Sequence, residues 1–167
     1  FVGNHDFWTL DYFTKEIGME VLKKPTEFKI NDKLFFIGHG DGLGPGDLKY
    51  KFLKRIFRNP LFIFLFRINY PWIGIPLGNF FSRNNKTLSG KQAKFISKDK
   101  EMLYLFCKKK LTKTFYDFFV FGHRHIPLKL DLDNGSYYYN TGDWITHYSY
   151  LVFDGNDILI KNYKNKN

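Results

Sequence analysis

The chain has 167 residues, 44% of them hydrophobic and 20% aromatic, so it can form one domain with a real core and is neither disordered nor collagen-like. Its 26 Lys and Arg against 16 Asp and Glu give a net charge of +10, which predicts a polyanionic partner: nucleic acid, anionic lipid headgroups or a phosphorylated substrate. A basic proteome or an incomplete chain would also produce this charge.

Cysteine content and hydropathy exclude further classes of protein. The single cysteine, Cys107, excludes a disulfide framework and a cysteine-based zinc site, and makes a reducing cytoplasm the natural compartment. No run of 18 apolar residues is present, so the sequence predicts no membrane-spanning helix. We see no signal peptide, although the sequence does not begin with Met and an upstream segment could carry one.

The sequence begins with FVGNHDFW, whose first two residues are typical of the end of a β-strand. Residues 3–6 then place a turn residue, an amide, an imidazole and a carboxylate in a row, as an active-site loop would. Thr9 is a suitable N-cap for a short helix that runs to Ile17 and is closed by Gly18.

Residues 27–38 (EFKINDKLFFIG) predict two strands joined at Asn31-Asp32, a dipeptide type favoured in hairpins. The second strand leads into residues 38–41 (GHGD) and a glycine-rich loop that ends at Asp47, a predicted N-cap.

The segment from Leu48 to about Lys113 has helical spacing and many Lys and Arg. It contains one helical run, KYKFLKRIFRNPLFIFLFRI, a break at Pro71, and a second helical run near Lys91–Lys110. We therefore expect a single domain over 1–167 that carries a helical insert over 48–113.

The strand pattern returns at residues 117–121 (DFFVF) and leads into residues 122–125 (GHRH). Two further hairpins are predicted, with turns at residues 133–135 (DNG) and 154–156 (DGN). The histidine-bearing loops thus follow strands, and strand C-termini are where layered α/β folds place their chemistry.

Four of the five histidines lie in three glycine-containing loops, GNHD, GHGD and GHRH: His5, His39, His123 and His125. On an extended segment, His123 and His125 would lie on one side because strand side chains alternate. That is a chelating arrangement, and neutral imidazole is a common ligand of transition metals. The loops therefore predict a metal centre.

These three motifs, in this order, resemble the last three motifs of the calcineurin-like metallophosphoesterases. Within that superfamily, the chain is most similar to the lipid A pathway pyrophosphatases that act on UDP-2,3-diacylglucosamine, through GNHDFW, HGDGLGPGDLKYK, the basic aromatic insert, FGHRHIP and the late GDW. The resemblance implies an α/β fold, a β-sandwich flanked by helices with a helical insert. Trp144, in the late GDW, is expected in the core.

The resemblance also implies the roles of the site residues. Asn4, His39 and His123 would bind one divalent metal ion and His125 a second. Family precedent favours Mn²⁺, and the donor types alone leave Fe and Zn open. His5 would face the phosphate and Asp6 would orient it, while Asp41 would support the ligands rather than bind metal.

For the substrate, the resemblance points to Asp47 and Tyr50 at the glucosamine headgroup and to Ser82, Arg83 and Lys86 at the headgroup and phosphate. Arg124 would reach a phosphate or point away. The insert would hold acyl chains in an apolar groove with a basic rim, or lie on an anionic membrane. A helical hairpin packed on the core, with solvated lysines, has the same composition.

The family pattern starts with Asp-x-His and Gly-Asp-x-x-Asp, and this sequence contains neither. We therefore expect that the chain lacks the N-terminal strands of the fold, including the carboxylate that bridges the two metals. The chain alone would then bind metal weakly, turn over little, and dissolve poorly because of exposed sheet edges.

The expected reaction of the intact parent is attack of water on the α-phosphate of UDP-2,3-diacylglucosamine, giving UMP and 2,3-diacylglucosamine 1-phosphate. The enzyme would be cytoplasmic and peripheral on the inner face of the bacterial inner membrane, without a nucleic-acid partner. The alternatives are another calcineurin-like phosphoesterase acting on a nucleotide or phosphodiester, a basic module that binds single-stranded nucleic acid, and a metal-free lipid-binding scaffold.

Overall fold

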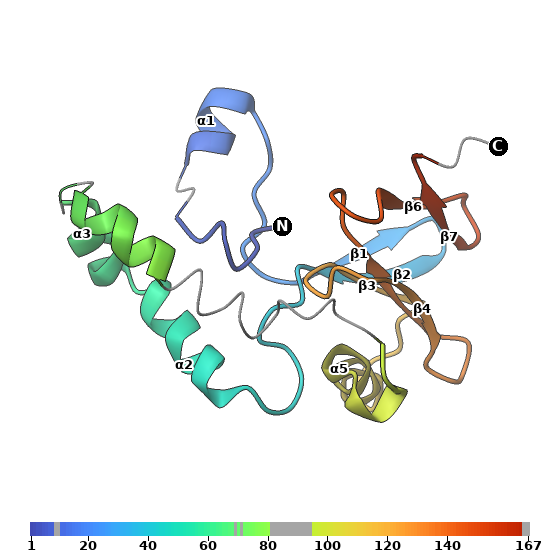
Figure 1. Cartoon of the computed structure of the whole chain (residues 1–167). Helices are drawn as coiled ribbons and strands as arrows, with labels where there is room; N and C mark the ends of the chain where they lie inside the picture. The colour runs from blue at the N-terminus through green and yellow to red at the C-terminus, as the bar shows by residue number, and fades with distance from the viewer. Residues whose placement is uncertain (9–10, 69, 71, 81–94, 165–167) are drawn as a thin grey trace.

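The computed structural model describes residues 1–8, 11–68, 70, 72–80 and 95–164. A five-stranded sheet lies at its centre (Figure 1), with its strands in the spatial order β1 (Thr26–Ile30), β2 (Lys33–Gly38), β3 (Phe118–Phe121), β5 (Tyr137–Thr141) and β4 (Pro127–Asp131). The inner pairs β2–β3 and β3–β5 are parallel, whereas β1–β2 and β4–β5 are antiparallel. The chain is a mixed α/β domain, as predicted at this coarser level.

Each face of the sheet has its own hydrophobic core. On one face, α5 (Met102–Leu111) packs Leu103, Tyr104 and Cys107 against residues that include Phe36 and Phe119. On the other face lies a two-stranded antiparallel sheet of β6 (Ser149–Phe153) and β7 (Ile158–Asn162), whose Ile158 packs with Phe35, Phe118 and Tyr139. Successive phenylalanines serve opposite cores because side chains alternate along a strand.

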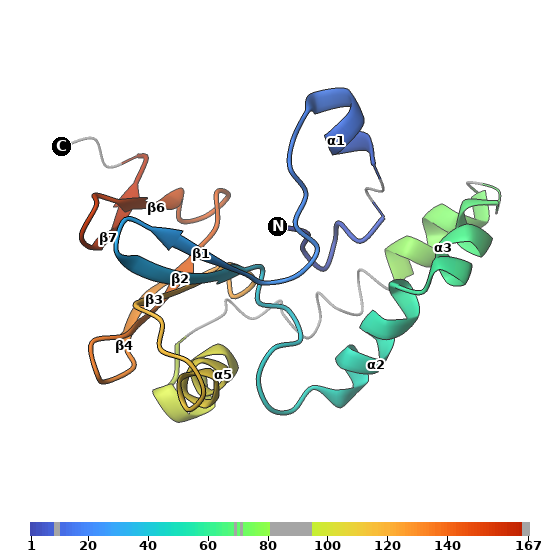
Figure 2. The same ribbon diagram turned by 180° about the vertical axis from the view of Figure 1, so that it is seen from behind.

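The remaining helices that the structure describes contribute no residue to these two cores. They are α1 (Tyr12–Ile17), α2 (Leu48–Phe57), α3 (Pro60–Arg67), a helical stretch over residues 72–80, and the 3₁₀ turn η1 (Lys98–Lys100) before α5. Figures 1 and 2 show α2 and α3 extending away from the sheet, and neither contains a buried residue. Among the described helices, none has the length and apolar composition needed to cross a bilayer.

Turn and cap signals were good predictors of local structure. The β1–β2 hairpin turns at Asn31-Asp32, with Ile30 paired to Lys33 and Asn31 at a φ of 55°. α1 ends at Gly18, whose φ of 72° is the left-handed conformation of a glycine C-cap. The predicted hairpin turns near Gly135 and Gly155 are also present.

The helical segment differs from the prediction in three places. The expected continuous helix stops at Phe57, and α3 starts anew, because Pro60 occupies its first turn and the Asn59 side chain accepts a hydrogen bond from the Leu61 N–H at 2.9 Å. The second α-helix begins only at Met102. Residues 95–97 before it are not helical, and residues 98–100 form the 3₁₀ turn η1. Asp47 precedes α2 as predicted, but its φ is 50° and its side chain makes no capping bond.

The remaining expectations about local structure concern the first two residues, Trp144 and a few positions near the gaps in the described residues. The first two residues lie outside any strand, although the Val2 N–H donates to the Leu22 carbonyl at 2.9 Å. Trp144 is not a core residue: it is 55% exposed and packs against Tyr148, Tyr150 and Tyr163. The first helix was expected to start with Thr9 as its N-cap, but α1 begins at Tyr12 with Asp11 at the N-cap position. Thr9 itself, the break at Pro71 and residues 91–94 of the second helical run lie outside the described residues.

Candidate metal centre

Two histidine loops meet because the strands that precede them run parallel. In the β2–β3 register, Gly38 pairs with Phe121, so the loops that follow emerge at the same edge of the sheet. The Gly122 N–H donates to the His39 carbonyl at 3.0 Å, and the ring centroids of His39 and His123 are 5.3 Å apart. The fold thus brings together imidazoles that are 84 positions apart in the chain.

The N-terminal loop adds an amide to this pair. The Asn4 Oδ1 lies 3.0 Å from the His39 Nε2. A Cβ on Gly3 would lie 2.9 Å from the His39 Cε1 and 3.0 Å from the Asp6 Oδ2, so a larger residue there would push the loop off the histidine. Glycine in GNHD therefore lets Asn4 reach His39.

The GHRH loop does not have the extended geometry that the sequence predicted. His123 and His125 have φ angles of 62° and 55°, in the left-handed region that non-glycine residues seldom adopt. A buried amide holds this loop: the Asn140 Nδ2 donates to the Gly122 carbonyl. The two imidazoles are close enough to interact electrostatically with each other and with His39, but their relation comes from the turn and not from strand alternation.

Burial keeps the inner imidazoles neutral. It lowers the pKa of His39, against the opposing influence of the Asp41 and Asp6 carboxylates. Burial, followed by the neighbouring His39, lowers the pKa of His123 to about 4. At neutral pH both rings therefore carry a free lone pair that can accept a proton or bind a cation.

The predicted catalytic pair lies at the surface. His5 and Asp6 are both exposed, and among the described residues no hydrogen bond joins their side chains. The Asp6 carboxylate is close enough to influence His39. His5 has no hydrogen bond or ion pair with any described residue, so its ring remains accessible beside Asn4.

Asp41 follows the His39 loop and is bonded to α2. It is 5% exposed, and its Oδ2 accepts hydrogen bonds from the Tyr50 hydroxyl at 2.8 Å and the Lys54 ammonium at 2.6 Å. Although burial opposes it, Lys54 and Tyr50 lower the pKa of Asp41, whereas burial and Asp41 raise that of Tyr50. This triad fastens α2 to the loop that carries His39, a link that no local sequence signal indicated.

The remaining predicted residues are placed as follows. Arg124 turns toward α5, where its Nε donates to the buried Glu101 carboxylate at 3.1 Å. Asp47 is exposed at the start of α2, and Tyr50 faces Asp41 with its ring centroid 6.5 Å from that of His123. Ser82, Arg83 and Lys86 lie outside the described residues.

The side chains of this cluster are of the chemical types that bind divalent cations. The cluster offers neutral imidazoles and an amide oxygen, which suit borderline metals such as Mn²⁺, Fe²⁺ or Zn²⁺. However, no three His, Cys, Asp or Glu side chains within the described residues form a group that could hold a metal ion. The set is therefore partial, and further oxygen ligands are required to complete a coordination sphere.

Comparison with known proteins gives consistent relatives, although no family model matches the chain. A UDP-2,3-diacylglucosamine hydrolase from Porphyromonas gingivalis is 33% identical over 174 residues, covering 96% of this chain and 66% of the relative. The hydrolase of that name from Psychromonas ingrahamii is 24% identical over 155 residues, covering 89% of this chain and 61% of the relative. One from Pseudomonas fluorescens strain SBW25 is 37% identical over 65 residues, covering 39% of this chain and 26% of the relative. The chain thus spans less than two thirds of the length of each of these relatives.

Proposed function

Because the chain is a homologue of the UDP-2,3-diacylglucosamine hydrolases, we propose that the whole protein hydrolyses the pyrophosphate bond of UDP-2,3-diacylglucosamine, releasing UMP and 2,3-diacylglucosamine 1-phosphate for lipid A biosynthesis. The observation that carries this proposal is the convergence of Asn4, His39 and His123 from three loops at one sheet edge. The proposed fold is a calcineurin-like metallophosphoesterase sandwich, whose further strands would supply the carboxylates that the described cluster lacks.

The proposed cofactors are two divalent metal ions, with Mn²⁺ favoured. Asn4, His39 and His123 would hold one, and His125 would contribute to the other. Bound divalent cations supply charge neutralisation at a phosphoryl group and lower the pKa of water. The low pKa of His123 suits this role, because a neutral ring binds a cation without first losing a proton.

His5 and Asp6 are the proposed catalytic residues of the chain itself. His5 is exposed beside Asn4 and has no partner among the described residues, so it can reach a phosphoryl oxygen of a bound substrate. There it would stabilise negative charge or give its proton to the departing phosphate oxygen of 2,3-diacylglucosamine 1-phosphate, with Asp6 orienting it. Of the two alternatives for Arg124, the ion pair with Glu101 favours the one in which its side chain points away from the substrate phosphate.

The helical insert is the proposed lipid site. α2 and α3 carry exposed apolar side chains, such as Phe52 at 65% exposure and Phe64 at 58%, beside the cations of α2. Acyl chains would lie on the apolar surface, with the headgroup at Asp47, Tyr50 and the SRNNK segment of Ser82, Arg83 and Lys86. The positive charge would serve substrate phosphates and the anionic inner-membrane surface rather than nucleic acid.

The test is Mn²⁺-dependent release of UMP from UDP-2,3-diacylglucosamine by the full-length protein. His123→Ala is expected to lower the rate at least a hundredfold, while Lys29→Ala, an exposed residue of β1, leaves it unchanged. A generic phosphodiester is the comparison substrate. A folded, metal-loaded protein that cleaves the generic diester but ignores the lipid nucleotide would contradict the proposed function.

A further inference from the structure

The GHRH loop contains a backbone conformation that histidine seldom adopts. His123 has a φ of 62°, and the N–H of Arg124 donates to the carbonyl of Gly122 at 2.6 Å. A hydrogen bond between the first and third residues of a turn, with a positive φ at the residue between them, marks the rarer and strained form of γ-turn. Such a turn persists only where neighbouring groups hold it in place. The position of His123 therefore depends on what binds the Gly122 carbonyl.

The side chain of Asn140 binds that carbonyl. Its Nδ2 donates to the Gly122 oxygen that closes the turn, and its Oδ1 accepts a hydrogen bond from the Gly142 N–H at 3.2 Å. The Nδ2 also donates to the Tyr138 hydroxyl at 3.3 Å. Asn140 and Tyr138 are both fully buried. Because buried polar groups depend on such partners, the amide is a fixed link between the turn at His123 and the end of β5.

The strand register places this amide next to the turn. β5 lies beside β3, and Asn140 is opposite Phe121, the last residue of β3. The side chain therefore has to cross only one strand spacing, about 4.8 Å, to reach the first residue of the loop. Asparagine suits the position because its amide has a donor for Gly122 and an acceptor for Gly142, whereas an ionised aspartate of the same size has acceptors alone.

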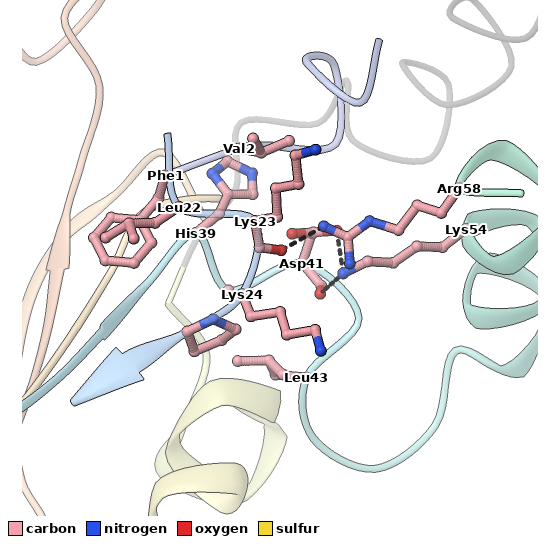
Figure 3. Close-up of a pocket in the computed structure, with 12 residues that line it drawn as sticks. Phe1, Val2, Leu22, Lys23, Lys24, His39, Asp41, Leu43, Lys54 and Arg58 are labelled. Carbon is pink, nitrogen blue, oxygen red and sulfur yellow. Dashed lines mark hydrogen bonds and ion pairs between the residues drawn. The ribbon is translucent and has the colours of Figure 1, made fainter. Parts of the chain in front are cut away.

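The histidine on the neighbouring loop is fixed independently. Asp41, two positions after His39, is bound by the Lys54 ammonium at 2.6 Å, and Figure 3 shows Asp41 between the His39 loop and the Lys54 side chain. The Gly122 N–H donates to the His39 carbonyl at 3.0 Å. Gly122 is thus held at its N–H by the His39 loop and at its carbonyl by the buried amide. These two bonds set the direction in which the His123 side chain leaves the backbone, and they bring its ring centroid to 5.3 Å from that of His39.

We propose that Asn140 is a positioning residue of the candidate metal centre, which holds the strained turn at Gly122 and so keeps the His123 imidazole beside His39. Without the amide, His123 can relax to the negative φ that non-glycine residues prefer, and its ring then turns away from His39. The inference rests on the proposed function, because it concerns the same centre, and it adds a residue that acts only through His123.

Two measurements on the full-length protein test this role without turnover. Hydrogen exchange of the Arg124 amide in the metal-free protein reports whether the turn stays closed. Calorimetric titration of Mn²⁺ into the metal-stripped protein reports whether His123 is still in place. The first variant is Asn140→Ala. Asn140→Asp, which keeps the size of the side chain and the acceptor for Gly142, replaces it if the first variant fails to fold.

Ser136→Ala is the matched control. Ser136 is fully buried and immediately precedes β5, and its Oγ donates to the Tyr116 carbonyl. Because β5 is parallel to β3, its start lies at the end of the sheet opposite the histidine loops. The control therefore removes a buried hydrogen bond from a side chain to a backbone carbonyl in the same sheet, away from the candidate metal centre.

We expect the Asn140 variant to exchange the Arg124 amide about tenfold faster and to bind Mn²⁺ about tenfold more weakly than wild type. Ser136→Ala should leave both quantities unchanged even where it lowers stability. Wild-type exchange of the Arg124 amide, or wild-type Mn²⁺ affinity, in the Asn140 variant overturns the proposal, and so does an equal effect of the control. A wild-type protein that fails to hydrolyse the lipid nucleotide contradicts the proposed function but leaves both measurements of Asn140 valid.

Discussion

The Glu101 carboxylate accepts a hydrogen bond from the Arg124 guanidinium, Oε2 to Nε at 3.1 Å, across the boundary between the core and the candidate metal centre. Glu101 is 2% exposed and immediately precedes α5, while Arg124 separates the two histidines of the GHRH loop. The other oxygen, Oε1, has no hydrogen-bond partner among the described residues. Among the described residues, Arg124 is therefore the cationic partner of this buried carboxylate, and it fastens the loop to α5.

Arg124→Ala should accordingly destabilise the protein. Leaving the Glu101 carboxylate buried and uncompensated is expected to cost about 2–4 kcal/mol of unfolding free energy, measured by urea denaturation. Adding Glu101→Gln removes the uncompensated charge and should restore a large part of that loss. Arg55→Ala, an exposed arginine of α2, should change the stability by less than about 0.5 kcal/mol. If Arg124→Ala behaved like this control, the pair would not anchor the loop.

The second prediction concerns the link between α2 and Asp41. Tyr50→Phe keeps the ring but deletes the hydroxyl that donates to the Asp41 Oδ2 at 2.8 Å, so it should lower the unfolding free energy by about 1 kcal/mol. Hydrogen exchange in α2 should also become faster, because one of its two side-chain ties to Asp41 is lost. Tyr12→Phe is the matched control, since the Tyr12 hydroxyl is exposed and makes no hydrogen bond to a described residue. Equal effects of the two substitutions would refute the link.

The third prediction is a pH dependence that arises outside the candidate site. The Asp143 Oδ1 accepts hydrogen bonds from the N–H groups of Ile145, Thr146 and His147, and its Oδ2 lies 2.7 Å from the His147 Nδ1. Although burial opposes it, these bonds lower the pKa of Asp143 below its usual range. The carboxylate therefore stabilises the fold at pH values above about 4, the unfolded pKa, and this contribution is lost as the pH falls through the folded pKa.

Asp143→Asn should thus destabilise the protein most near neutral pH and progressively less below pH 4. Thermal unfolding of the two proteins at a series of pH values measures this difference. The control is Asp32→Asn, in the exposed β1–β2 turn, which should not alter the pH profile. A difference in unfolding temperature between wild type and Asp143→Asn that stayed constant at all pH values would show that ionisation of Asp143 does not stabilise the fold.

The features that could be predicted from the sequence are those set by neighbouring residues or by the alignment of strands. The meeting of His39 and His123 was predictable, because each follows a hydrophobic strand and parallel strands align their ends. The strand-like relation of His123 and His125 was not, because φ angles of 62° and 55° are imposed by the turn and its tertiary contacts. The division of the insert at Asn59-Pro60 had a local signal in its cap and proline, which the apolar periodicity on both sides concealed.

No local sequence pattern indicated the polar contacts between residues far apart in the chain. Glu101 lies 23 positions before Arg124, in a charged stretch that reads as solvated helix, and only the packing of α5 on the sheet buries it beside the loop. Trp144 shows the converse, since an aromatic residue near a strand was expected in the core but packs on the surface with Tyr148, Tyr150 and Tyr163. Composition identifies the kinds of side chain present, whereas burial depends on the tertiary arrangement.

The last prediction tests the cluster as a cation site. If Asn4, His39 and His123 share one metal ion, removing any of the three should weaken Mn²⁺ binding by the full-length protein about tenfold to a hundredfold. Calorimetric titration of the metal-stripped protein measures this, and a chelator should abolish UMP release until Mn²⁺ is restored. His147→Gln is the control, because His147 pairs with Asp143 outside the cluster and should leave Mn²⁺ affinity intact. Equal Mn²⁺ affinity in wild type and His123→Ala would show that the cluster does not bind the metal, even though its imidazoles are neutral and adjacent.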